Sequence, residues 1–147
     1  METHNNKLYI WYALNTGMDS DFADLLSAAK DKILHSKGSK IKIISHIDAD
    51  GISSASILSL ALDRLNINHD VHFTSLDGIP SSDLGELTIF LDMGSGQIDY
   101  LMSKYEDREI IILDHHQGEY PKTPFIEVNP NKYGYSGSND KRYANPE

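Results

Sequence analysis

The sequence predicts an α/β fold built on one parallel β-sheet of about five strands, and three observations lead to this prediction. Short apolar or β-branched runs alternate along the chain with segments of helical periodicity. The segments between successive runs are too long for hairpin turns and suit crossover helices. The length of 147 residues fits one domain with one core.

The elements are expected at regular intervals along the chain. A first helix is expected over 19–37, where apolar residues recur at helical spacing, acidic residues lie in the first turn and Gly38 follows the end. Two further helices are expected over 52–65 and 97–105. The five strands are expected at 41–44, 71–74, 87–91, 110–113 and 125–128.

The two ends of the chain are less regular than its centre. The apolar run 8–14 is compatible with an edge strand, a helix start or a docking arm, and the sequence leaves these open. The expected organisation is an N-terminal arm over 1–18, a domain over 19–139 and a loop or disordered tail over 140–147.

Composition excludes several classes of protein. With no cysteine, disulfides and thiolate zinc sites are excluded. No apolar run approaches the roughly 20 residues of a membrane span, and no basic and apolar leader is visible. We therefore expect a soluble, cytoplasmic protein with no membrane partner.

The charge balance constrains any partner that carries phosphate. Thirteen Lys and Arg against 22 Asp and Glu give a net charge of -9. This is the wrong sign for a domain that binds nucleic acid by neutralising phosphates alone. Bound cations would have to reverse the local field.

The first group of chemically active residues follows the strand at 41–44. In an extended segment His46, Asp48 and Asp50 would point to one side, with Gly51 opening the next helix. The alternative is that Asp48 or Asp50 only caps this helix while His46 packs against it.

Two more groups follow later strands. Asp92 follows 87–91 and precedes the turn Gly94-Ser95-Gly96, in which backbone amides could approach an anion. Asp114-His115-His116 follows 110–113, and its acid and two imidazoles would meet the other groups at one edge of the sheet.

Ionisable side chains crowded at one edge of a buried sheet repel or desolvate each other unless a cation joins them. Carboxylate and imidazole ligands without thiolate favour manganese, with magnesium, cobalt or zinc as alternatives. The groups could hold two ions bridged by Asp92, which favours hydrolysis of a phosphate ester or anhydride.

These residues also resemble a known family. The segment 46–51, Asp92 with its turn, and 114–116 resemble motifs one to three of the DHH phosphoesterase superfamily, and 44–51 is most similar to its archaeal RecJ-like branch. The resemblance covers about 20–139. It implies a Rossmann-like DHH domain and a manganese-dependent exonuclease that acts on single-stranded DNA or RNA.

The resemblance also assigns roles to individual residues. It implies that Asp92, Asp114, His115 and His116 form the catalytic group, with Asp92 bridging the ions and Asp114 supporting the ligands. The implied metal ligands for two Mn²⁺ ions are His46, Asp48, Asp50, Asp92 and His115. The implied contacts to the substrate phosphate are His116, Gly94, Ser95, Gly96 and Asn129.

The fourth motif departs from the family pattern. Asn129-Pro130 and 134–138 resemble it, but Ser136-Gly137 stands where the family has Asp-Gly, which would remove one ligand. The family also continues into a DHH-associated domain that binds the nucleic acid strand. We therefore expect this chain to correspond to the DHH domain alone.

Two alternatives to the exonuclease hypothesis stay open. The first is an inactive scaffold in a replication complex, because the superfamily is similar to an inactive subunit of the eukaryotic replicative helicase; five retained ligands argue against it. The second is a phosphoesterase for small substrates such as short oligonucleotides, cyclic dinucleotides or pyrophosphate. A replication-complex protein is a further expected partner.

Overall fold

The computed structural model describes residues 20–36, 38–79 and 84–135. The expected arm at 1–18, the tail at 140–147 and Ser136-Gly137 lie outside the described residues. The helices are α2 (Ser20–His35), α3 (Ala49–Arg64) and α4 (Ile98–Tyr105). The strands are β1 (Ile41–His46), β2 (His69–Thr74), β3 (Leu87–Leu91), β4 (Glu109–Leu113) and β5 (Ile126–Val128). Short 3₁₀ turns occur at Leu76–Gly78, Ser95–Gln97 and Pro130–Tyr133.

The five strands form one sheet in the order β2-β1-β3-β4-β5, and every pairing is parallel. The predicted α/β class and strand number are therefore confirmed. From β1 the chain crosses to β2 on one side, whereas β3, β4 and β5 follow on the other. The crevice between β1 and β3 is thus a topological switch point, where open α/β sheets bind ligands at their carboxyl ends.

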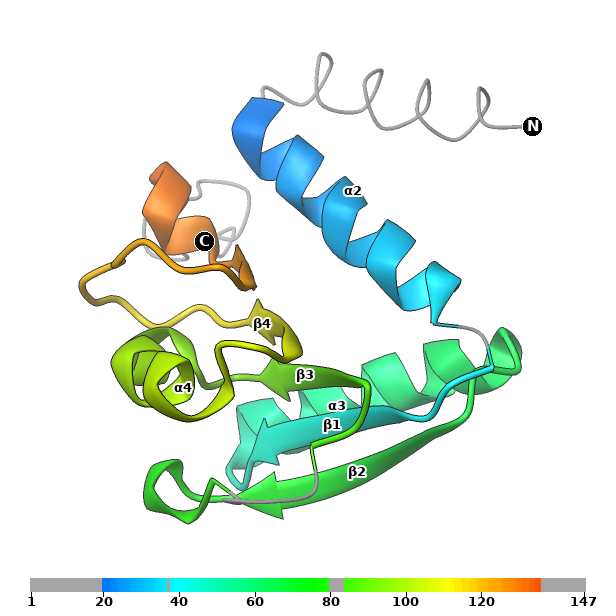
Figure 1. Ribbon diagram of the computed structural model, residues 1–147. Coiled ribbons are helices and arrows are strands. Elements are labelled where there is room, and N and C mark those ends of the chain that lie inside the picture. Colours follow the sequence, from blue (N-terminus) through cyan, green and yellow to red (C-terminus); the bar gives the residue numbers. More distant parts are fainter. Residues whose placement is uncertain (1–19, 37, 80–83, 136–147) are drawn as a thin grey trace, which may run out of the picture.

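Helices cover both faces of the sheet because its strands are apolar on both faces. On one face, α2 and α3 pack over a cluster that includes Ile43, Ile89 and Ile111 (Figure 1). On the other face, α4 packs over Phe90 and Ile112. No helix in the described part of the chain is both long and apolar enough to cross a membrane.

The boundary between β1 and α3 differs from the sequence prediction. The strand continues to His46, and the helix begins at Ala49, three residues before the expected start. Asp48 is the N-cap, and its carboxylate accepts a hydrogen bond from the Gly51 amide at 2.9 Å. The prediction of one extended segment carrying His46, Asp48 and Asp50 is therefore wrong, because capping favours early helix initiation.

Candidate metal centre

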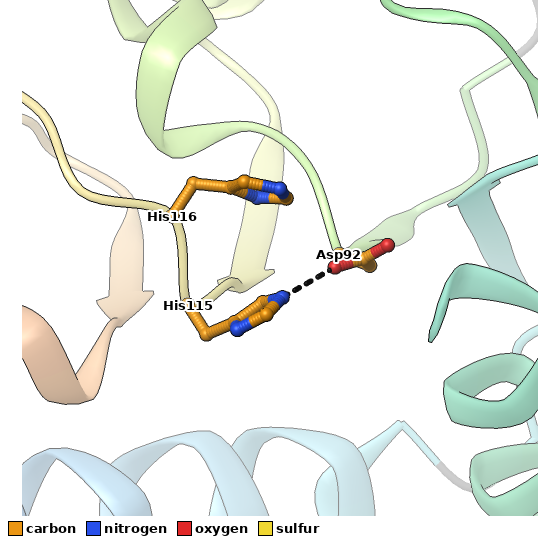
Figure 2. Close-up of side chains that lie close together, drawn as sticks. All are labelled: Asp92, His115 and His116. Carbon is orange, nitrogen blue, oxygen red and sulfur yellow. Dashed lines mark hydrogen bonds and ion pairs between the residues drawn. The ribbon is translucent and has the colours of Figure 1, made fainter. Parts of the chain in front are cut away.

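The strand ends bring the three predicted groups together at one edge of the sheet. His46 is the last residue of β1, Asp92 follows β3, and His115 and His116 follow β4. Figure 2 shows Asp92, His115 and His116 with their side chains facing one another. The three residues offer ligand atoms that all lie within 4.8 Å of one another.

A second group of the same kind shares one residue with the first. His46, Asp48 and Asp92 also offer ligand atoms that lie within 4.8 Å of one another. Asp92 therefore belongs to both groups, and its two carboxylate oxygens face different imidazoles. Its Oδ1 lies 3.0 Å from His115 Nε2, and its Oδ2 lies 3.8 Å from His46 Nδ1.

The five predicted ligands are grouped around Asp92. His46 Nδ1 lies 2.9 Å from Asp48 Oδ2. Asp50, in the first turn of α3, has its Oδ2 3.9 Å from His115 Nε2. The helix start thus places Asp48 and Asp50 toward the same edge of the sheet as Asp92, although they do not share an extended segment with His46.

Asp92 is held in an unfavourable environment. Only 3% of its side chain is exposed, and its backbone has a φ of +57°, in the left-handed region that Asp tolerates better than most residues. Burial raises the pKa of Asp92, and the neighbouring Asp48 carboxylate raises it further. Within the described part of the chain, its buried Oδ2 makes no hydrogen bond, and neither does the buried Nδ1 of His46, whose 2.9 Å contact with the Asp48 carboxylate lacks hydrogen-bond geometry.

The pKa of Asp48 is shifted in the opposite direction to that of Asp92. Its pKa is lowered to about 2, chiefly by the hydrogen bond from the Gly51 backbone. An ionised carboxylate therefore stands beside Asp92 under most conditions. Two neighbouring carboxylates and two unpartnered buried atoms form a donor set that fits a divalent cation.

Glycine is required at position 51 by close packing. A Cβ built there would lie 2.0 Å from the carbonyl oxygen of His46. The first turn of α3 therefore lies directly against the end of β1. This contact sets how near Asp48 and Asp50 come to His46.

Asp114 organises the loop that follows β4. Its Oδ2 accepts a hydrogen bond from the Ser95 amide at 3.0 Å, and its Oδ1 accepts from the amides of His115 and His116. Oδ1 also faces His116 Nδ1 at 2.7 Å. Burial alone would raise the pKa of Asp114, but these hydrogen bonds, led by that of His116, hold it below its ordinary range.

The same contact affects the imidazole. The hydrogen bond to Asp114 raises the pKa of His116, although partial burial opposes the shift. The resemblance implies that Asp114 supports the ligand imidazoles. In the structure its carboxylate contacts the His116 ring, whereas for His115 it contacts the backbone amide.

The turn after Asp92 is occupied by contacts within the protein. The Gly94 amide donates to Gln97 Oε1 at 3.0 Å, and the Ser95 amide donates to Asp114. In this structure the two amides are therefore paired within the protein, and their expected contact with a phosphate stays a prediction. Gly96 is exposed and stays a candidate for phosphate contact.

Asn129 is fully buried and hydrogen bonds to the loop that follows β4. Its side-chain nitrogen donates to the carbonyl oxygen of His116 at 2.9 Å and to Ser95 Oγ at 3.1 Å. Both amide hydrogens are used, so none is left for a phosphate. The Asn129 amide thus holds the His116 backbone and the Ser95 hydroxyl oxygen in place, and the expected phosphate contact of Ser95 stays a prediction.

Sequence reasoning missed two residues at this site. The side chain of Asn131 donates to the carbonyl oxygen of His115. Ser45 is fully buried beneath the cluster and hydrogen bonds to the backbone of α3. Asn129 as the cap of a short 3₁₀ turn and Asn131 within it form a typical side-chain-to-backbone pattern that could have revealed the first, whereas nothing local marks Ser45.

Asp92 lines two clefts. One of about 190 Å³ is lined by His46, Asp92 and His116 together with Gln97 and Gln117. The other, of about 380 Å³, lies between α3 and the ends of β4 and β5. Among the described residues, neither cleft is lined by a lysine or an arginine.

Solved structures share this fold. The chain superposes on RecJ from Thermus thermophilus in complex with Mn²⁺ with a TM-score of 0.61 and 23% identity, over 77% of this chain and 17% of RecJ. A structure of exonuclease RecJ bound to manganese superposes with a TM-score of 0.58 and 23% identity, over 71% of this chain and 30% of that chain. CDC45 from Entamoeba histolytica superposes with a TM-score of 0.52 and 17% identity, over 75% of this chain and 24% of CDC45. At these identities the likeness is one of fold.

Sequence similarity establishes the family. The chain is 34% identical over 127 residues to an uncharacterized protein of Methanocaldococcus jannaschii, and the match covers 77% of this chain and 28% of that protein. The chain thus spans less than a third of the length of this relative. Residues 40–139 match the model of the DHH family's N-terminal domain. The matched residues include all three groups of site residues. The chain therefore belongs to the DHH family.

Proposed function

We propose that this chain is a phosphodiesterase domain that uses two divalent cations, preferably Mn²⁺, to hydrolyse single-stranded DNA or RNA. The observation that carries the proposal is that Asp92 belongs to both three-residue groups. A carboxylate shared in this way could contribute to both ions of a two-metal centre. The manganese in both RecJ structures supports the choice of ion.

The ligand assignment combines the distances with the resemblance to the DHH motifs, which adds Asp50 to the ligands and leaves His116 for the phosphate. His46, Asp48 and Asp92 would hold one ion, whereas Asp50, Asp92 and His115 would hold the other. Bound cations at such a centre act as Lewis acids and generate a nucleophilic hydroxide near neutral pH. Imidazole and carboxylate ligands without thiolate suit Mn²⁺, with Mg²⁺ or Co²⁺ as substitutes.

The protein itself would orient the phosphate. Asp114 holds His116 through Nδ1, which leaves Nε2 to donate to a phosphate oxygen. The raised pKa of His116 favours the protonated ring, which suits contact with an anion. Since neither cleft has a lysine or arginine among its described lining, phosphate binding would depend on the cations.

The experiment combines binding with hydrolysis. Calorimetric titration with Mn²⁺ should show two ions bound to the 147-residue chain, and end-labelled single-stranded DNA and RNA oligonucleotides should be cleaved in Mn²⁺ but not in chelator. Asp92→Ala should abolish both results. Asp107→Ala, in the exposed turn before β4, is the matched control and should change neither.

The remaining outcomes separate the alternatives. A chain that binds no Mn²⁺ would be an inactive scaffold, for example in a replication complex. The similarity of its fold to CDC45 is the reason to consider partners of that class. A chain that binds Mn²⁺ but cleaves only pyrophosphate or cyclic dinucleotides would be a small-substrate phosphoesterase. Either result would overturn the proposal of single-strand hydrolysis.

A further inference from the structure

The larger cleft beside Asp92 has two chemically different ends. Its acidic end consists of the metal-centre residues described above. Its other end, here called the neutral end, is formed by the last residues of β4 and β5 and by three residues of α3. The neutral end consists of Leu113, Val128, Ser53, Ser54 and Ile57.

The neutral end combines apolar surface with hydroxyl groups. Ile57 is 71% exposed, so its aliphatic surface is open to a ligand in the cleft. Ser53 donates its hydroxyl to the Ala49 carbonyl at 2.7 Å, so its oxygen stays available as an acceptor. Ser54 is half-buried on the same wall. These groups would suit a ligand with a flat apolar part and polar hydroxyls.

We propose that the neutral end binds the nucleoside attached to the scissile phosphate. The proposal rests on the proposed function, because it takes the phosphate to lie at the metal centre. The apolar side chains would contact the base, and the two serines would hydrogen bond with the sugar. The volume of about 380 Å³ is within the range of small-ligand sites.

Charge distinguishes the nucleoside from other occupants. A second phosphate at the neutral end would find no cationic side chain among the described lining residues, and it would be repelled by the carboxylates of Asp50 and Asp114. An uncharged group meets no such penalty. The cleft therefore selects nucleoside phosphates over pyrophosphate or inorganic polyphosphate.

The test compares two ligands that carry the same phosphate monoester. Adenosine 5′-monophosphate and methyl phosphate are titrated in saturating Mn²⁺ into the 147-residue chain by calorimetry. The nucleotide should bind about tenfold more tightly, because only it buries apolar surface at the neutral end. The double variant Ser54→Ala/Ile57→Ala should lose most of this difference while its affinity for methyl phosphate stays unchanged.

Helix α3 supplies a matched control on another part of its surface. Ser56 and Leu60 are an exposed serine and an exposed aliphatic residue that do not line the cleft. Ser56→Ala/Leu60→Ala should keep the full preference for the nucleotide. Equal affinities of wild type for the two ligands, or equal losses in both double variants, would overturn the proposal.

The two proposals fail in different ways. A preference for the nucleotide without any hydrolysis of oligonucleotides would leave the nucleoside site standing and remove the proposed function. Hydrolysis without a preference would retain the metal-dependent activity and remove the nucleoside site. Absence of binding by either phosphate ligand in Mn²⁺ would reject both.

Discussion

The hydroxyl of Ser45 donates a hydrogen bond to the carbonyl oxygen of Gly51 at 2.8 Å, and it lies 3.4 Å from the carbonyl oxygen of Leu91. It therefore joins the first turn of α3 to the last residue of β3. Asp48 and Asp50 lie beside the first contact, and Asp92 follows the second. A buried hydroxyl thus fixes the spacing of three candidate ligands without touching any of them.

Ser45→Ala should weaken the affinity for Mn²⁺ by about tenfold, the effect typical of losing a group that positions metal ligands. The loss of one buried hydrogen bond should lower the free energy of unfolding in chelator by only about 1 kcal/mol. Calorimetry and urea unfolding measure the two effects. Ser56→Ala removes an exposed serine hydroxyl from α3 and should change neither; unchanged Mn²⁺ affinity in Ser45→Ala would contradict the positioning role.

Asp92→Asn should stabilise the metal-free protein while abolishing its stabilisation by Mn²⁺. Because the pKa of Asp92 is raised by burial, its carboxylate destabilises the fold above its ordinary pKa of 3.8. Asn is neutral and tolerates the same backbone conformation. In chelator, the melting temperature should rise by about 2–4 °C at pH 7, and this gain should shrink toward acid pH. A lower melting temperature in chelator would exclude the effect.

The contribution of the Asp114–His116 pair to the stability of the fold should depend on pH. The pKa of His116 is raised from 6.5, so its contribution to stability is full below 6.5 and is lost as pH rises through the folded value. The pKa of Asp114 is lowered from 3.8, so its contribution is full above 3.8 and is lost as pH falls through the folded value. The pair is therefore most stabilising between these two ordinary values.

NMR titration of the histidine ring in metal-free protein provides the measurement. The midpoint of His116 should lie above 6.5 in wild type and should fall in Asp114→Asn, because the carboxylate is the main cause of the shift. An unchanged midpoint for His116 would show that the contact is not made in solution.

Asn129→Asp should be nearly as damaging as Asn129→Ala. Aspartate keeps the oxygen that accepts from the Asn131 amide at 3.0 Å, but it cannot donate to His116 or Ser95. Two lost donations at a buried position should cost about 2–3 kcal/mol. Thermal unfolding measures the loss; full stability in the Asp variant would show that acceptance alone supports the loop.

The predictable part of the molecule is its periodic part. The five strands and three helices follow from apolar runs and helical periodicity, and burial is complete in the central strand β3 from Leu87 to Leu91. The placement of Asp92 and His115 at one sheet edge follows from parallel topology alone. Boundaries are harder to predict, because the start of α3 depends on Asp48, a residue equally suited to capping and to ligation.

The roles of polar groups with several possible partners could not be predicted. Ser95 and Asn129 have the donors that a phosphate would need, yet 34 positions apart in sequence they hydrogen bond to each other. Ser45 lies in a largely buried strand, and its partner is set by how closely α3 approaches β1. Such pairings depend on tertiary distances that no local pattern encodes.

Because every strand pairing in the sheet is parallel, the site can form only when segments distant in sequence have assembled. Parallel neighbours require a crossover between them, so no hairpin within the sheet offers a local starting point for folding. The groups around Asp92 come from β1, β3 and β4, which meet only through long-range contacts, and these generally form slowly. Fragments of the chain would therefore have little of the centre, and ion affinity would report that the whole sheet has assembled.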